Sequence, residues 1–203
     1  DELLLFDSVD VPGLFNEAIR GPLRGHVLRI AETVIPWKDV ITNRTIGDKL
    51  ARLQSTRACH FCDLRNADMS GMELNGVDLR RANLAGANLS GASLHGARLI
   101  EANIIGATLK GAALAGANLS RAKFTGTDLT GVDLSHTDIS EVDFRNLDLS
   151  GANLKFAALA DTDLTGANLS GVDLLGARYL KRATLVGVNL NNANLCCKDL
   201  RGV

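Results

Sequence analysis

The sequence predicts an all-β solenoid: a four-sided β-helix of about seven coils, preceded by a small N-terminal α-helical cap. Two observations predict this fold class. A large apolar residue recurs at every fifth position from Leu64 to Tyr179, through 24 consecutive pentads. When the residues two positions after it are grouped at a spacing of twenty, one group contains only glycine and another contains only charged residues. A period of five matches neither the 3.6-residue turn of an α-helix nor the two-residue alternation of a flat strand.

Each pentad is expected to form one short strand and one corner. If the large residue is called i, the residue at i−2 is small and the residue at i−1 is polar, as in Ala87, Asn88 and Leu89. In an extended chain i−2 and i point inward and i−1 points outward. Ser or Thr at i+1 and Gly at i+2 then suit a tight turn, because Gly tolerates positive φ.

The spacing of twenty predicts four sides in every coil, with equivalent positions stacked at about the 4.8 Å strand spacing. One corner column holds only glycine: Gly71, Gly91, Gly111, Gly131, Gly151 and Gly171. Another column holds only charged residues: Arg81, Glu101, Arg121, Glu141, Asp161 and Lys181. We expect this charge ladder to be structural, because exposed ion pairs contribute only about 0–1 kcal/mol each.

The same register places Phe124 directly over Phe144 in the interior, where the two rings should stack. After Tyr179 the phase slips by one residue, so a bulge or small corner loop is expected near 180–183. The 28 pentads between residues 62 and 202 make seven coils of four, about 34 Å long at the strand spacing.

The motif Ala-Asn/Asp-Leu-x-x, seen as "ANLAGANLSGASLHG" and "GANLSGVDLLG", resembles the pentapeptide-repeat proteins. The resemblance covers residues 58–203 and implies a right-handed quadrilateral β-helix. It also implies a non-catalytic rigid scaffold or a protein–protein interaction module. Two alternatives stay open: a DNA mimic that binds a type II topoisomerase, and a structural subunit that docks a larger assembly through an uncapped C-terminal coil.

Residues 1–57 have a different composition and are expected to form a helical cap over the open end of the solenoid. Two segments carry helix signals. "GPLRGHVLRIAETVIP" has apolar residues at helical spacing, at Leu23, Val27, Ile30, Ala31 and Val34, followed by Pro36. "TIGDKLARLQ" offers Thr45 as an N-cap with Asp48 three residues later. The alternative is a remnant of a partner-binding domain.

Cys59 and Cys62 have a spacing that suits a disulfide, half of a zinc site or two small buried side chains. The burial interpretation is preferred, since Cys62 takes an i−2 position. Cys196 and Cys197 lie about seven coils away, so no intramolecular zinc site is expected. No cofactor is predicted.

Two groups of residues are candidates for binding. An acidic ring of five successive i−1 positions circles the middle of the solenoid: Asp128, Asp133, Asp138, Asp143 and Asp148. This ring could attract a basic partner, but we expect a structural role because Asp side chains bond nearby backbone groups. The second group is apolar and outward-facing and is the candidate protein-binding surface: Phe156, Leu175 and Leu180, with Leu200 and Val203 in the last coil.

Charge and composition exclude several classes of function. The chain has 22 basic and 23 acidic residues, and the repeat alone has 14 and 15, so neither nucleic-acid binding nor a strongly negative mimic of DNA is favoured. No window is long and apolar enough for membrane insertion, and none of the four histidines sits in a catalytic constellation. We therefore expect a soluble, non-enzymatic chain, cytoplasmic or in an organelle lumen after presequence removal, with a protein partner or a homodimer through the C-terminal coil.

Overall fold

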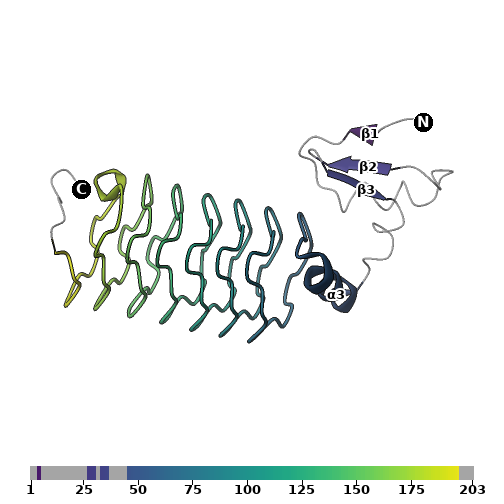
Figure 1. The fold of residues 1–203 in the computed structure, drawn as a ribbon. Coiled ribbons are helices and arrows are strands. Elements are labelled where there is room, and N and C mark those ends of the chain that lie inside the picture. Colours follow the sequence, from purple (N-terminus) through teal and green to yellow (C-terminus); the bar gives the residue numbers. More distant parts are fainter. Residues whose placement is uncertain (1–3, 6–26, 31–32, 37–44, 197–203) are drawn as a thin grey trace. The chain divides into compact units, whose positions relative to one another are not determined.

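The computed structural model describes residues 4–5, 27–30, 33–36 and 45–196, and it divides into two compact units, Asp1–Asp48 and Lys49–Val203. Figure 1 shows the fold of each unit.

In the first unit the structure contains strands where the sequence suggested a helix. Strand β2 (Val27–Ile30) pairs in parallel with β1 (Leu4–Leu5) and antiparallel with β3 (Thr33–Pro36), in the order β1-β2-β3. The pairing of β2 with β3 runs from Val27 opposite Pro36 to Ile30 opposite Thr33. The helix prediction is therefore wrong at Val27, Ile30 and Val34, while Leu23 and Ala31 lie outside the described residues. The β-branched residues of both segments favour strands, and pairing with β1 decides the outcome.

Helix α3 (Ile46–Thr56) begins as predicted, at an N-cap formed by Thr45. The Asp48 amide donates to Thr45 Oγ1 at 3.1 Å and the Thr45 amide donates to Asp48 Oδ2 at 3.2 Å, the reciprocal pair of a capping box. At the other end, Leu53 is fully buried in the solenoid core. Arg57 follows with a φ of 57° and ends the helix.

The solenoid is a right-handed, four-sided β-helix, as predicted. Outward i−1 residues pair in parallel with the residue twenty positions later, beginning with Ala58 and Asp78. Residues 58–196 thus make about seven coils, seen stacked along one axis in Figure 1. We name the sides of a coil A to D by their central residues, which in one coil are Leu84, Leu89, Leu94 and Leu99.

The interior is filled by the large and small residues of each pentad. The central residues and the small i−2 residues form one continuous buried cluster from Cys59 to Ala183. Phe124 and Phe144 lie next to each other in this interior as predicted, with ring centroids 5.0 Å apart and ring planes tilted by 48°.

Outward Asp and Asn residues hold the corners. In most pentads the i−1 side-chain oxygen accepts the amide of the residue two positions later, as Asn88 Oδ1 does from Ser90 at 3.1 Å and Asn118 Oδ1 from Ser120 at 3.0 Å. This local bond satisfies the corner backbone and explains why Asn and Asp recur at this position.

The phase slip occurs one residue earlier than the sequence suggested. A short 3₁₀ helix, η1 (Leu180–Arg182), accommodates the additional residue, and the pairing offset changes from 20 at Ala158–Arg178 to 21 at Asp163–Thr184. Leu180 is only 5% exposed and takes the interior position, whereas Tyr179 is 59% exposed. The prediction that Leu180 faces outward is therefore wrong. A narrow apolar interior accepts leucine, while the tyrosine hydroxyl stays in solvent.

Candidate functional site

The charge ladder forms ion pairs between consecutive coils along the corner between sides D and A. Arg81 Nε lies 2.7 Å from Glu101 Oε2, and Arg121 Nε lies 2.8 Å from Glu141 Oε2. At the upper end Asp161 pairs with Arg182. Arg182 takes the position predicted for Lys181, whose side chain is not among those described, because the phase slip shifts the register.

Phe61 lies one coil below Arg81 in the same column, and its ring is 5.5 Å from the Arg81 guanidinium. Glu141 raises the pKa of Arg121 through hydrogen bonds and charge. All these side chains are well exposed, so each pair contributes little stability on its own. The column therefore supports the corner and shows no ligand site.

The acidic ring is engaged with the backbone. Each of its five carboxylates accepts the amide of the residue two positions later. The hydroxyl of Thr130 also donates to Asp128, and the guanidinium of Arg145 donates to Asp143. These hydrogen bonds lower the pKa of Asp128 and Asp143, and Ser150 does the same for Asp148. These hydrogen bonds are those expected of a structural role for the ring.

Cys59 and Cys62 are both buried, as predicted, but they are joined by a disulfide, the alternative that the sequence did not favour, with 5.3 Å between their Cα atoms. They occupy the interior positions that Leu79 and Ala82 fill one coil later. Cys196 is exposed, and Cys197 lies outside the described residues. In the part of the chain that the structure describes, no group of three or more His, Cys, Asp or Glu residues is arranged to hold a metal ion.

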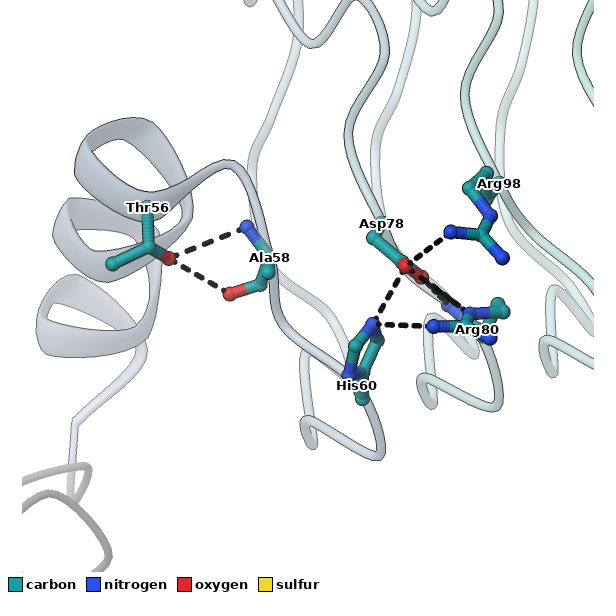
Figure 2. A network of polar contacts seen from close by, with 6 residues as sticks. All are labelled: Thr56, Ala58, His60, Asp78, Arg80 and Arg98. Atoms are coloured by element: carbon teal, nitrogen blue, oxygen red, sulfur yellow. Dashed lines mark hydrogen bonds and ion pairs between the residues drawn. The ribbon is translucent and has the colours of Figure 1, made fainter. Parts of the chain in front are cut away.

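Sequence reasoning missed a polar network on the first three coils. Figure 2 shows Asp78 receiving three donors: His60 Nε2 at 2.7 Å, Arg80 Nε at 2.9 Å and Arg98 Nη1 at 3.3 Å. Burial raises the pKa of Asp78, but the hydrogen bonds from Arg80 and His60 outweigh it and lower that pKa to about 2. The twenty-residue spacing of Asp78 and Arg98, and of His60 and Arg80, was the signal available in the sequence.

This network does not resemble a catalytic site. A His–Asp pair can orient a general base, but a base needs a nucleophile or substrate proton within reach. Among the described residues the polar side chains that contact His60 are those of Asp78 and Arg80. Figure 2 also shows Thr56, at the end of α3, bonded through its hydroxyl to the amide and carbonyl of Ala58. The network therefore ties the first coils together.

The corner between sides C and D carries an exposed aromatic group. We define the aromatic corner as His136, Phe156, Leu175 and Gly176. The rings of His136 and Phe156 are stacked, with centroids 4.8 Å apart and planes 18° from parallel. On its other side the Phe156 ring covers Gly176, where a Cβ atom would lie 2.2 Å from it. Phe156 and Leu175 are 42% and 41% exposed.

The structure brings together two of the predicted binding residues. Phe156 and Leu175 lie at the aromatic corner, whereas Leu180 is buried and belongs to the core. Leu200 and Val203 lie outside the described residues. Exposed Tyr179 was missed because the sequence placed it in the interior.

These features define the class of protein: a right-handed β-helix built from five-residue repeats. The family model described as pentapeptide repeats matches the chain in eight copies, over residues 59–81, 78–112, 109–146 and 148–178. The chain belongs to the pentapeptide-repeat family.

Two solved structures of QnrB1 show the same fold. Full-length QnrB1, a plasmid-mediated fluoroquinolone resistance protein, is 22% identical, with a TM-score of 0.59 over 72% of this chain and 78% of that one. A trypsin-treated variant of QnrB1 gives a TM-score of 0.50 at 22% identity, over 72% and 76% of the two chains. Rfr23 from the cyanobacterium Cyanothece 51142 is 24% identical over 74% and 95%, with a TM-score of 0.31. A comparison with curated protein sequences found no match. No helix in the described part of the chain is long and apolar enough to cross a membrane.

Proposed function

We propose that the chain is a non-catalytic protein-binding module, whose rigid β-helix presents the aromatic corner to a protein partner. The observation that carries this proposal is the conformation of Phe156. Its φ is 61°, in the left-handed region, and its ring is held partly in solvent between two other residues of the corner.

This conformation is costly, and the fold does not require it. Of the other described positions in this corner column, four hold glycine, at Gly76, Gly96, Gly116 and Gly176, and one holds His136. A residue with a Cβ costs roughly 1–2 kcal/mol in the left-handed region, and the 42% of Phe156 that stays exposed adds no burial. The charge-ladder residues from Arg81 to Glu141 have the same left-handed φ but pair with one another, whereas Phe156 keeps an exposed apolar surface, and this surface favours a role in contact with another molecule.

The ring is also preorganised for binding. His136 and Gly176 fix its orientation from two sides, so little conformational freedom is lost when a partner covers it. Aromatic residues in fixed positions are the usual centres of protein interfaces. Leu175, exposed beside it, extends the apolar surface. Together these residues fit an apolar pocket of a protein better than a charged ligand.

Mimicry of duplex DNA is less well supported. A mimic needs a broad negative surface, but the acidic ring is bonded to the backbone, and most arginines of the charge ladder and the Asp78 network are paired with carboxylates. Purified protein should leave supercoiling by a type II topoisomerase unchanged at micromolar concentration. Inhibition would favour the mimic instead.

Docking through the C-terminal coil is the second candidate, and it would involve the leucines of the last described coil. Leu185, Leu190 and Leu195 are only partly buried, whereas Leu164 and Leu169, on the same sides one coil earlier, are fully buried. A homodimer or larger assembly that covers these leucines should appear in light scattering. A species of 21.5 kDa at all concentrations would contradict it.

The aromatic corner is tested by comparing Phe156→Gly with Asn146→Gly. Asn146 is a matched control: its φ is 58°, it is exposed, and it also covers a glycine of the next coil, Gly166. Both variants relieve the left-handed strain, so both should melt at or above the wild-type temperature. In quantitative affinity capture from source cells, the partner should be lost with Phe156→Gly and retained with Asn146→Gly. A partner retained equally by both variants would refute the proposal.

A further inference from the structure

Consecutive coils are normally joined by two amide donors in each pentad. The central residue and the residue two positions later both donate to the next coil. On side A, Ile104 N lies 2.8 Å from Lys123 O and Gly106 N lies 3.0 Å from Thr125 O. On side B, Leu109 N lies 2.9 Å from Asp128 O.

One step of the solenoid lacks these bonds on two adjacent sides. Within the described residues, the amides of Phe124, Gly126, Leu129 and Gly131 have no backbone hydrogen bond to the coil of residues 142–161. The amides of Asp143 and Asp148 likewise have none to the coil below. Bridge pairing is kept at Lys123–Asp143 but is lost at Asp128–Asp148. We call this open step on sides A and B the seam.

The other two sides of the same step are closed. On side C, Leu134 N lies 2.9 Å from Asn153 O, and on side D, Ile139 N lies 3.1 Å from Ala158 O. The His136–Phe156 stack also bridges this step, at the corner between sides C and D. The other backbone bonds between coils that are missing among the described residues lie on side C, at the amides of Leu154, Asp173 and Gly176, or at the phase slip, at the amide of Asp161.

Bulky interior residues account for the inner part of the seam. The Phe124 and Phe144 rings occupy stacked interior positions on side A, and both are fully buried. On side B, Leu147 occupies the i−2 position, directly above Thr127. The same column holds alanine in other coils: Ala67, Ala87, Ala107 and Ala167. Additional volume in a narrow, filled interior is relieved by moving backbone apart.

Like charges account for the outer part. At three other steps of side B an Asn side chain links neighbouring coils: Asn88 Nδ2 donates to Asp68 Oδ1 at 3.1 Å, Asn168 Nδ2 donates to Asp148 Oδ1 at 3.0 Å, and Asn189 Nδ2 donates to Asn168 Oδ1 at 3.0 Å. Across the seam, Asp148 stands above Asp128. Two ionised carboxylates supply no donor and repel each other.

We infer that the seam is a joint that divides the β-helix into two rigid segments. The segments open and close on sides A and B and stay joined on sides C and D. The closed side includes His136 and Phe156, so a molecule that binds there contacts both segments at once. The joint does not depend on the proposed function, because it follows from the interior and side B alone.

Residue-resolved amide hydrogen exchange of the full chain by NMR tests the joint. The amides of Phe124, Gly126, Leu129 and Gly131 should exchange roughly tenfold or more faster than those of Ile104, Gly106, Leu109 and Gly111, which make the same bonds one coil earlier. Equal protection of the two sets would overturn the inference.

The variant Asp148→Asn tests the cause. Its amide can donate to Asp128 while still accepting from Asn168, as Asn168 itself does between Asp148 and Asn189. Protection at Leu129 and Gly131 should then rise several-fold. Asp138→Asn is the matched control, since it makes the same charge change in the acidic ring on closed side D.

An equal rise in protection with both variants would show a general charge effect and refute the joint. Leu147→Ala provides an independent route, because it restores the small interior residue of the column. It too should raise the protection of Leu129 and Gly131. No change with either Asp148→Asn or Leu147→Ala would contradict the inference.

Discussion

The Gly176→Ala substitution tests the packing of the aromatic corner directly. A Cβ at this position would lie 2.2 Å from Phe156 Cδ1 and 2.3 Å from Cε1, so the ring has to leave its place. The left-handed φ of 70° costs an alanine about 1 kcal/mol. Loss of the stack with His136 adds about 0.5–1.5 kcal/mol. We expect the free energy of unfolding, measured by urea denaturation, to fall by about 2 kcal/mol.

Gly131→Ala is the control that separates the two contributions. Its φ is 65°, and a Cβ there meets no atom within 4 Å, so only the backbone cost of about 1 kcal/mol applies. In a Phe156→Gly background the two alanine substitutions should become equal. If Gly176→Ala costs no more than Gly131→Ala in the wild-type chain, the Phe156 ring does not rest on Gly176 and the preorganisation argument fails.

Three further predictions concern electrostatics and the disulfide. Arg121→Glu places three acids in succession along the charge ladder and should lower the melting temperature, more at low than at high salt; an unchanged melting temperature at low salt would contradict a role for the ladder. The pKa of Asp78, about 2 against an ordinary 3.8, stabilises the fold above pH 3.8, and this stability is lost as the pH falls towards 2. Asp78→Asn should lower the free energy of unfolding by about 2 kcal/mol at neutral pH and reduce its dependence on pH between about 4 and 2. An unchanged pH dependence would exclude Asp78 as the cause of the loss of stability in acid. Reduction with dithiothreitol should lower the melting temperature of the wild type but not of a Cys59→Leu, Cys62→Ala variant, which carries the residues of later coils; an equal effect on both would mean that the disulfide contributes nothing.

The repeat could be predicted from sequence because its fold depends on local periodicity. The twenty-residue spacing predicts the four sides, the contact between Phe124 and Phe144, and the column of Arg121 and Glu141. Each of these depends on which residues are equivalent in neighbouring coils, and the sequence states that directly.

Departures from periodicity were harder to predict. The sequence placed Tyr179 inside and Leu180 outside. Where one residue is added to the repeat, the pentad pattern alone does not decide which of two adjacent residues takes the interior position. In the first unit, Val27 and Ile30 suited either a helix or a strand, and pairing with β1 decided between them. The seam escaped notice for another reason: Leu147 and Asp148 each obey the pentad pattern, and only their neighbours one coil below make them incompatible.

The bond from each outward Asp or Asn to the corner backbone has a consequence for how such a chain acquires a function. The fold constrains three positions of every pentad: the two interior positions, i−2 and i, and the outward position i−1, whose side chain bonds to the corner backbone. Selection is left with the two corner positions, arranged along four edges in rows about 4.8 Å apart. In this chain some of those corner positions are occupied by Phe156, His136 and the paired residues of the charge ladder. The position of a binding residue in a protein of this kind is therefore defined by its coil and its corner. Substitutions at one corner can change the partner without altering the β-helix.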